Sequence, residues 1–120
     1  MKTTIGKAVK GLVELYKKHI PANAWLDDNQ LKVYVRITER YLDGERLPSI
    51  DIANVEVVRE LRGNGIFAGV LADIEQIAQD TGRIVYVESI LEPRLERFLQ
   101  QRGYEEVPKA MPPCWFRRVK

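Results

Sequence analysis

The sequence contains a single cysteine, Cys114, and a single histidine, His19, among its 120 residues. One cysteine cannot form a disulfide within the chain, and zinc sites need several cysteine or histidine ligands. The composition therefore excludes a disulfide-stapled framework, and we expect no metal site. A cysteine nucleophile needs a base that makes it a thiolate, and His19 lies in a distant segment. We expect Cys114 to be an ordinary strand residue.

A strong charge of either sign is also missing, since 19 lysines and arginines face 17 acidic residues and the net charge is +2. This charge is too small for a broad basic surface, so the composition argues against nucleic acid as a partner. No apolar run approaches the roughly 20 residues of a membrane span. The first residues do not lead into the apolar core of a signal peptide. We therefore expect no membrane partner and a cytoplasmic location.

Internal repeats, low-complexity tracts and linker-like stretches are absent as well. With 45% hydrophobic residues, the chain should bury roughly two-thirds of the surface that its unfolded form exposes. We expect one domain over residues 1–120.

The first segment has the spacing of an amphipathic helix from Ile5 to Ile20, with lysines between its apolar positions. Thr3 or Thr4 is expected to cap this helix, and Pro21 to end it. The apolar stripe predicts packing on a sheet. A basic helix of this kind can also meet a membrane or a partner protein, and that alternative stays open.

A loop over residues 21–30 is expected to lead into a hairpin. Apolar and polar residues alternate from Leu31 to Thr38, as in a half-buried strand. Asp43 and Gly44 supply a turn, and a second, antiparallel strand is expected from Pro48 to Val58. Its last residues are nearly continuously apolar, which predicts cover on both faces of the sheet.

Helical and strand patterns alternate in the rest of the chain. We expect helices over residues 65–82 and 92–103, a short buried strand over residues 83–87, and closing strands over residues 104–107 and 114–119. This order predicts an α/β or α+β fold with a mixed sheet. The connection from Val58 to Ile84 implies a parallel crossover.

The segment from Val57 to Ala68 carries the clearest chemical signal, because a buried strand leads through two glycines into a helix. Gly63 and Gly65 let the backbone amides turn inward, and a first helical turn offers unpaired donors and a partial positive charge. Such a loop suits a phosphate or pyrophosphate, with Arg62 as an added cation. The spacing is neither a dinucleotide fingerprint nor a Walker loop. A plain tight turn is the alternative.

This loop, running Arg62-Gly63-Asn64-Gly65-Ile66, resembles the coenzyme A pyrophosphate loop of the GNAT superfamily of N-acetyltransferases. A second motif agrees, since Phe98, Gly103 and Tyr104 fall in register with the apolar, glycine and aromatic positions of a later helix in that family. The resemblance covers residues 55–107, nearly half of the chain.

The resemblance implies a GNAT-like α/β (α+β) fold, with a mixed, mostly antiparallel sheet flanked by helices. It implies acetyl-coenzyme A (acetyl-CoA) as cofactor, and transfer of the acetyl group to an amine of a small molecule or protein by direct attack. A homodimer is a further option. The residues expected to hold the cofactor are Val57, Val58, Arg62, Gly63, Asn64, Gly65, Ile66, Phe67 and Phe98.

Direct attack requires a neutral amine and a proton for the leaving thiolate. Glu56, beside the cofactor strand, is the first candidate for the general base, and Glu88 is the second. Tyr104 is a candidate acid, although such a tyrosine is also often a core residue with a satisfied hydroxyl.

Leu99 stands where the family commonly has the tyrosine that protonates the thiolate. Leucine has no proton to give. The chain is therefore either an N-acetyltransferase that uses another proton source, or an acyl-CoA-binding regulatory module with little or no catalysis. An interaction protein with a structural loop is a third hypothesis.

Overall fold

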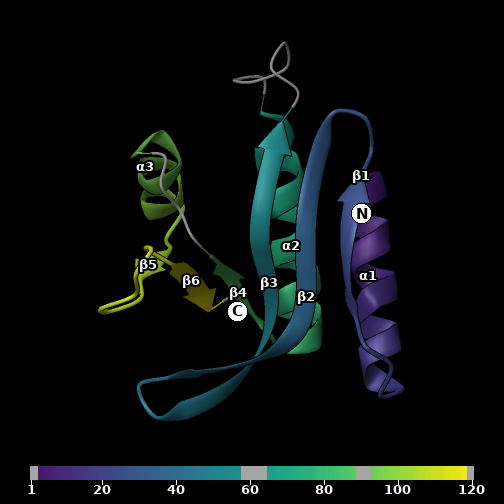
Figure 1. Cartoon of the computed structure of the whole chain (residues 1–120), viewed down its shortest axis with the longest axis horizontal. Coiled ribbons are helices and arrows are strands. Elements are labelled where there is room, and N and C mark those ends of the chain that lie inside the picture. The colour runs from purple at the N-terminus through teal and green to yellow at the C-terminus, as the bar shows by residue number, and fades with distance from the viewer. Residues whose placement is uncertain (1–2, 58–64, 89–92, 119–120) are drawn as a thin grey trace.

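The computed structural model describes residues 3–57, 65–88 and 93–118. Within them the chain forms three helices and one six-stranded sheet, shown in Figure 1. The elements are α1 (Thr4–Lys17), β1 (Asn23–Asp27), β2 (Leu31–Leu42), β3 (Glu45–Val57), α2 (Ile66–Thr81), β4 (Ile84–Val87), α3 (Pro93–Gln101), β5 (Glu105–Glu106) and β6 (Trp115–Arg118).

The sheet has the strand order β1-β2-β3-β4-β6-β5. Only β3 and β4 are parallel, and every other neighbouring pair is antiparallel. The predicted mixed, mostly antiparallel sheet is therefore confirmed, and so is the parallel crossover that α2 makes between β3 and β4.

Helix α1 begins as predicted, because the Thr3 hydroxyl accepts a hydrogen bond from the Gly6 amide at 2.9 Å. Its end was predicted too late. The helix stops at Lys17, and the His19 and Ile20 amides donate back to carbonyls of the last turn while His19 adopts a left-handed φ of 61°. This is a Schellman motif, so the chain leaves the helix before Pro21.

The prediction of a loop over residues 21–30 is wrong for residues 23–27. Residues Asn23–Asp27 form the edge strand β1, which pairs antiparallel with β2. The alternation of buried and exposed residues in β1 is weak, because Ala24 and Leu26 are only half-buried and Trp25, on the other face, is 47% exposed. An edge strand of this kind has little apolar signal.

The β2–β3 hairpin turns at Asp43 and Gly44, both with left-handed φ values. Two such residues give the tight turn that suits the twist of a hairpin. The register shifts once, where Tyr34 is opposite Asn54 but Val35 is opposite Ile52, so Ala53 is an extra residue in β3. This β-bulge bends the strand beside its pairing with β4.

The core lies on one face of the sheet, between the strands and the helices. Residues Val33, Val35, Ile50 and Ile52 point to this helix face and are fully buried, as is Leu99 of α3. The three inward residues predicted for α3 (Leu95, Phe98 and Leu99) all pack in or against this core.

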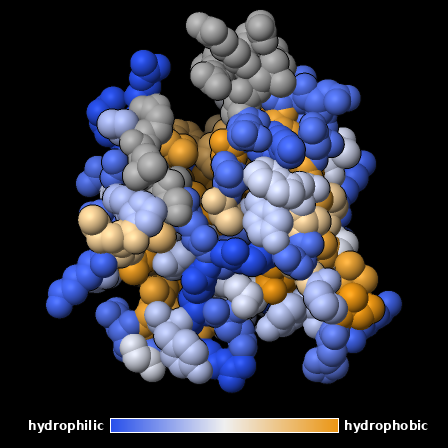
Figure 2. Space-filling model, viewed as in Figure 1, coloured by the Kyte–Doolittle hydropathy of each residue, from blue (hydrophilic) through white to orange (hydrophobic). Residues whose placement is uncertain are grey.

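The opposite face of the sheet, which we call the open face, carries no helix in Figure 1, where α2 runs behind β2 and β3. Figure 2 shows hydrophilic residues across the middle of the same view. The prediction that the end of β3 is covered on both faces is wrong, because Glu56 is exposed. Within the described ranges, no helix is long and apolar enough to cross a membrane, and no cluster of acidic, histidine and cysteine residues could hold a metal.

Candidate functional site

The parallel strands β3 and β4 separate part-way along β3. They pair from Ser49 to Ile52, and the Glu88 amide then donates to the Ile52 carbonyl at 2.9 Å. Beyond Ile52, β3 continues to Val57 and pairs only with β2 among the described strands. We call the point at Ile52 and Glu88 the fork. Past the fork, the edge of β3 offers backbone donors and acceptors to a ligand that runs alongside it.

Helix α2 begins shortly after this free edge. Gly65 precedes it with a left-handed φ of 73°, which glycine adopts without steric cost. No side chain hydrogen-bonds as a cap at Gly65, and the first turn has no acidic residue. The first amides of α2 are therefore donors for an anion.

The predicted cofactor residues are only partly within the described ranges. The structure places the backbone of Val57 on the free edge, and Gly65, Ile66 and Phe67 at the start of α2. Four others, Val58, Arg62, Gly63 and Asn64, lie outside the described residues.

Phe67 of α2 and Phe98 of α3 are brought together, with ring centroids 6.2 Å apart. Both rings are partly buried against the core, as are Val55 and Ile66. An apolar surface therefore lies beside the free amides of α2 and the free edge of β3.

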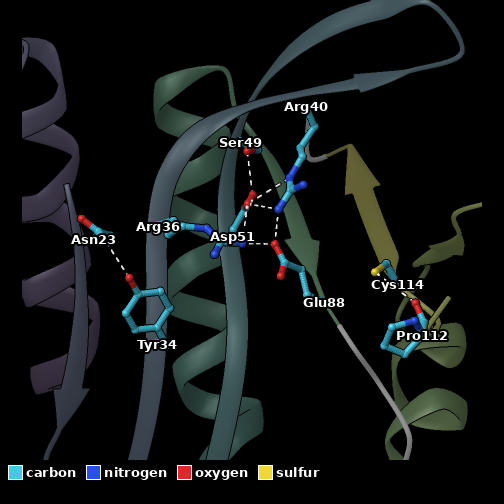
Figure 3. Close-up of polar contacts among 9 residues, drawn as sticks. All are labelled: Asn23, Tyr34, Arg36, Arg40, Ser49, Asp51, Glu88, Pro112 and Cys114. Carbon is cyan, nitrogen blue, oxygen red and sulfur yellow. Dashed lines mark hydrogen bonds and ion pairs between the residues drawn. The ribbon is translucent and has the colours of Figure 1, made fainter. Parts of the chain in front are cut away.

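Four charged side chains meet on the open face at the fork, as Figure 3 shows. The Arg36 and Arg40 guanidiniums both donate to Glu88, and Arg40 Nε also donates to Asp51 at 2.9 Å. We call Arg36, Arg40, Asp51 and Glu88 the arginine–carboxylate cluster. It joins β2, β3 and the end of β4.

Asp51 is the anchor of the arginine–carboxylate cluster because it is completely buried. Burial raises the pKa of the Asp51 carboxyl, while hydrogen bonds from Arg40 and from the Ser49 hydroxyl at 2.7 Å oppose that rise. Glu88, with a side chain 20% exposed, faces solvent at the fork.

Glu56 lies on the same open face, past the fork and opposite Lys32 in the register. Its side chain is exposed and has no hydrogen bond or ion pair with another described residue. The two predicted carboxylates thus share a face but differ in setting: two arginines hold Glu88, whereas Glu56 has no such partner in the part of the chain that the structure describes.

Tyr104 lies elsewhere, in the core on the helix face. Its hydroxyl donates to Glu75 Oε2 at 2.8 Å, and the same carboxylate accepts hydrogen bonds from Arg102 and Arg117. We call these four residues the Glu75 cluster. Burial is the main cause that raises the pKa of Tyr104, and the Glu75 carboxylate adds to it. The structure does not bring this hydroxyl to the arginine–carboxylate cluster.

Sequence reasoning missed Arg36, Arg40 and Asp51. The only signal for them is that Arg36 and Arg40 fall at polar positions of an alternating strand, four residues apart and so on one face. Their pairing with Glu88 spans about fifty residues and depends on how three strands are ordered in the sheet.

Comparison with known proteins finds no matching family model and no match among curated proteins. Solved structures do match. A mutant of the toxin AtaT bound to acetyl-CoA and the C-terminus of the antitoxin AtaR has a TM-score of 0.62 and 16% identity, over 90% of this chain and 74% of that one.

Two further solved structures have a similar fold. AtaT complexed with acetyl-methionyl-tRNAfMet has a TM-score of 0.61 and 15% identity, over 89% of this chain and 76% of that one. Naa50 of Arabidopsis thaliana with the bisubstrate analogue CoA-Ac-MVNAL has a TM-score of 0.53 and 14% identity, over 72% and 62%. Identities this low establish architecture alone. The chain therefore has the fold of the GNAT acetyltransferases.

Proposed function

We propose that this protein binds acetyl-CoA and transfers the acetyl group to an amine. The observation that carries the proposal is the free edge of β3 past Ile52, which leads toward the N-terminus of α2. The strand edge suits the amide-rich pantetheine arm, and the first amides of α2 suit the pyrophosphate. Two of the solved structures of similar fold contain acetyl-CoA, which supports this choice of ligand.

The proposed path sets the thioester at the fork. A pantetheine arm that pairs with β3 from Val57 toward Ile52 ends beside Glu88. Phe67 and Phe98 would line the apolar side of that path, with their rings 6.2 Å apart. Val58, Arg62, Gly63 and Asn64 are proposed to complete the cofactor site.

Glu88 is the carboxylate nearest to this proposed reaction point. We assign it the role of receiving the proton of the acceptor amine, directly or through a water molecule, with Arg36 and Arg40 fixing its position. Glu56 is the second candidate, because its exposed carboxylate is free to accept a proton. Tyr104 is the weaker candidate for the acid, since its hydroxyl already donates to Glu75.

A second function is favoured by one observation, the complete burial of Leu99. An apolar side chain packed in the core cannot protonate a thiolate. The alternative is a module that binds acyl-CoA without efficient transfer, and it shares the same cofactor site.

Calorimetric titration with acetyl-CoA tests the cofactor site. We expect one site per chain, and absence of binding at near-millimolar acetyl-CoA would refute both functions. Desulfo-coenzyme A should also bind, since the pyrophosphate and the pantetheine arm supply the contacts.

Release of free thiol, measured with a panel of amines, separates the transferase from the binding module. The panel should include methionyl-tRNA and the peptide MVNAL, because related acceptors occur in complexes of AtaT and Naa50. A diamine covers small-molecule acceptors. Binding without thiol release for every acceptor would favour the module.

A further inference from the structure

A cavity of about 760 Å³ lies between the middle of β2 and the C-terminal turn of α1. It opens where β1 begins, because the Ile37 amide donates to the Ala22 carbonyl at 2.9 Å and β2 then continues to Leu42 without β1 beside it. We call this cavity the Arg83 pocket. Part of its wall is apolar, formed by Ile20, Pro21, Ala22 and Ile37.

Arg83 is unusual among the residues of this pocket because it is a charged residue that is only 9% exposed. Nη1 donates to the carbonyls of Thr38 and Ser49 at 3.2 and 3.1 Å, and the guanidinium lies 4.9 Å from the centre of the Tyr16 ring. No carboxylate of the described chain hydrogen-bonds to it. Burial lowers the pKa of this guanidinium, as expected for a cation with too few charged partners.

Two nitrogens of Arg83, Nε and Nη2, have no acceptor among the described residues. Neither nitrogen is enclosed. Among the described residues, Trp115 Nε1 is the only enclosed side-chain nitrogen or oxygen without a hydrogen-bond partner. Solvent therefore reaches these nitrogens, and Arg83 is a lining residue of the pocket. Together, Nε and Nη2 form the fork that binds an oxyanion through two hydrogen bonds.

The other charges around the pocket have partners. Lys17 pairs with Glu14, Arg46 with Glu39, and Arg36 belongs to the arginine–carboxylate cluster. His19 adds an imidazole at the rim, and Glu39 is the one acidic residue that lines the pocket. Arg83 is thus the lining arginine that lacks an ion pair within the described ranges.

We propose that the Arg83 pocket binds a phosphate group of a nucleotide-like ligand, with the phosphate on Arg83 and an apolar or planar part against the Ile20–Ala22 wall. A phosphate has enough oxygens to accept from the Arg83 fork and from Lys17 or His19 at once. The volume far exceeds that of a phosphate alone, which leaves space for an attached base or sugar. This site is distinct from the proposed cofactor site, which follows β3 from Ile52 to Val57, although Arg36 lines the pocket and also contacts Glu88 at the fork.

The test is titration of the full chain with inorganic phosphate and with AMP, followed by the NMR signal of the Arg83 Nε–H group. We expect both probes to shift this signal, and AMP to bind more tightly because it also fills the apolar wall. Saturating coenzyme A in a parallel titration distinguishes the two sites. Displacement of AMP by coenzyme A with no change in the Arg83 Nε–H signal would overturn the proposal, since AMP would then occupy the cofactor site.

Two variants test the role of charge. Arg83→Lys removes the fork, and Lys17→Glu reverses an exposed charge at the rim; we expect each to weaken AMP binding at least about fivefold at low salt. Lys10→Glu is the matched control, since Lys10 is an exposed lysine of α1, also one turn from Glu14, but does not line the pocket. Its affinity should change less than twofold.

Unchanged affinity in both pocket variants would refute the site, as would equal affinity for acetate and phosphate. Arg83→Lys also loses bonds to two carbonyls, so its thermal unfolding must be measured beside the titration. Should that variant unfold, Lys17→Glu alone decides. A nucleic-acid source of the phosphate is distinguished from a free nucleotide by a single-stranded oligonucleotide that competes with AMP.

Discussion

The Glu88 amide donates to the Ile52 carbonyl at 2.9 Å, and in the described chain this is the last hydrogen bond that joins β4 to β3. The same residue directs its side chain to Arg36 and Arg40 on the open face. Glu88 therefore closes the paired part of the strands with its backbone and places a carboxylate where the free edge begins.

Replacing Glu88 tests whether this carboxylate takes part in acetyl transfer. For Glu88→Gln we expect turnover to fall about 100-fold, with acetyl-CoA affinity nearly unchanged, because general-base catalysis is typically worth this much. Steady-state thiol release and calorimetry give the two quantities.

Glu56→Gln is the matched control, since it makes the same change on the same face without breaking an ion pair. It should retain turnover and melting temperature. The opposite pattern, a loss of turnover in Glu56→Gln alone, would transfer the role of base to Glu56.

Gly65 should be required for binding acetyl-CoA. A valine there must adopt a left-handed φ, which costs roughly 1–2 kcal/mol, and its backbone is expected to leave the geometry that presents the α2 amides. We predict that Gly65→Val weakens acetyl-CoA binding at least about tenfold, or roughly 1.4 kcal/mol. Gly44→Val is the control, because Gly44 has a similar φ of 76° and equal space but lies in the β2–β3 turn. Equal affinity in the two variants would count against the α2 site.

Leu99→Tyr should destabilise the protein instead of restoring a proton donor. Leu99 is completely buried, and forcing a larger side chain into a packed core typically costs 1–3 kcal/mol. Leu99→Met conserves volume and should cost less. Denaturant unfolding measures both values, and a tyrosine variant as stable as the methionine variant would show that the site has room for a hydroxyl.

The Glu75 cluster is predicted to be structural. Glu75→Gln should lower the free energy of unfolding by about 1–3 kcal/mol, since the part-buried Arg102 and Arg117 lose the buried carboxylate with which they pair. Glu14→Gln, in the exposed pair with Lys17, should cost less than about 1 kcal/mol. Tyr104→Phe should lower stability by about 1 kcal/mol with no change in turnover. A loss of turnover without a loss of stability would instead identify Tyr104 as the acid.

Tyr86 should make the protein sensitive to alkali. Burial, together with the neighbouring Cys114 thiol, raises the pKa of Tyr86 to about 12, against the opposing effect of Arg40. Between pH 10 and about 12, unfolded Tyr86 loses its proton and folded Tyr86 keeps it, so stability falls by up to about 1.4 kcal/mol per pH unit.

Tyr86→Phe should remove that part of the slope when urea unfolding is measured across this pH range. Tyr41→Phe is the control, because Tyr41 is 73% exposed. Parallel curves for the wild type and Tyr86→Phe would contradict the prediction.

Local patterns predicted most of the elements because their causes are local. Thr3 supplies a cap, Asp43 and Gly44 supply a turn, and the spacing of apolar residues in α2 repeats with the helical period. The end of α1 was misjudged because a Schellman motif at His19 acted before Pro21 did. Strand β1 was missed because its residues gain little burial at the edge of the sheet.

The site was less accessible to sequence reasoning. The glycine loop and the aromatic pair Phe67 and Phe98 could be expected, since they belong to motifs within single segments. The partners of Glu88 could not be expected, because Arg36 and Arg40 reach it only when β2, β3 and β4 are neighbours in the sheet. Arg83 gave no signal either, since what distinguishes it is that Nε and Nη2 of its guanidinium find no acceptor among the described residues.

Ala53, the extra residue of the β-bulge, determines which insertions and deletions in β3 the fold tolerates. Asp51 and Glu56 are five positions apart, so a regular strand would point them to opposite faces; the register instead sets both on the open face, opposite Arg36 and Lys32. Deleting Ala53 would remove the bulge and leave the alternation intact, with Asp51 and Glu56 four positions apart on the open face and Val55 still inward. An insertion in the regular stretch after Ala53 would instead exchange inside and outside for the residues that follow it in β3. Insertions at the Asp43–Gly44 turn carry no such exchange. Among length variants of this hairpin, we therefore expect changes at the turn and the deletion of Ala53 to survive, and an insertion after Ala53 in β3 to be lost.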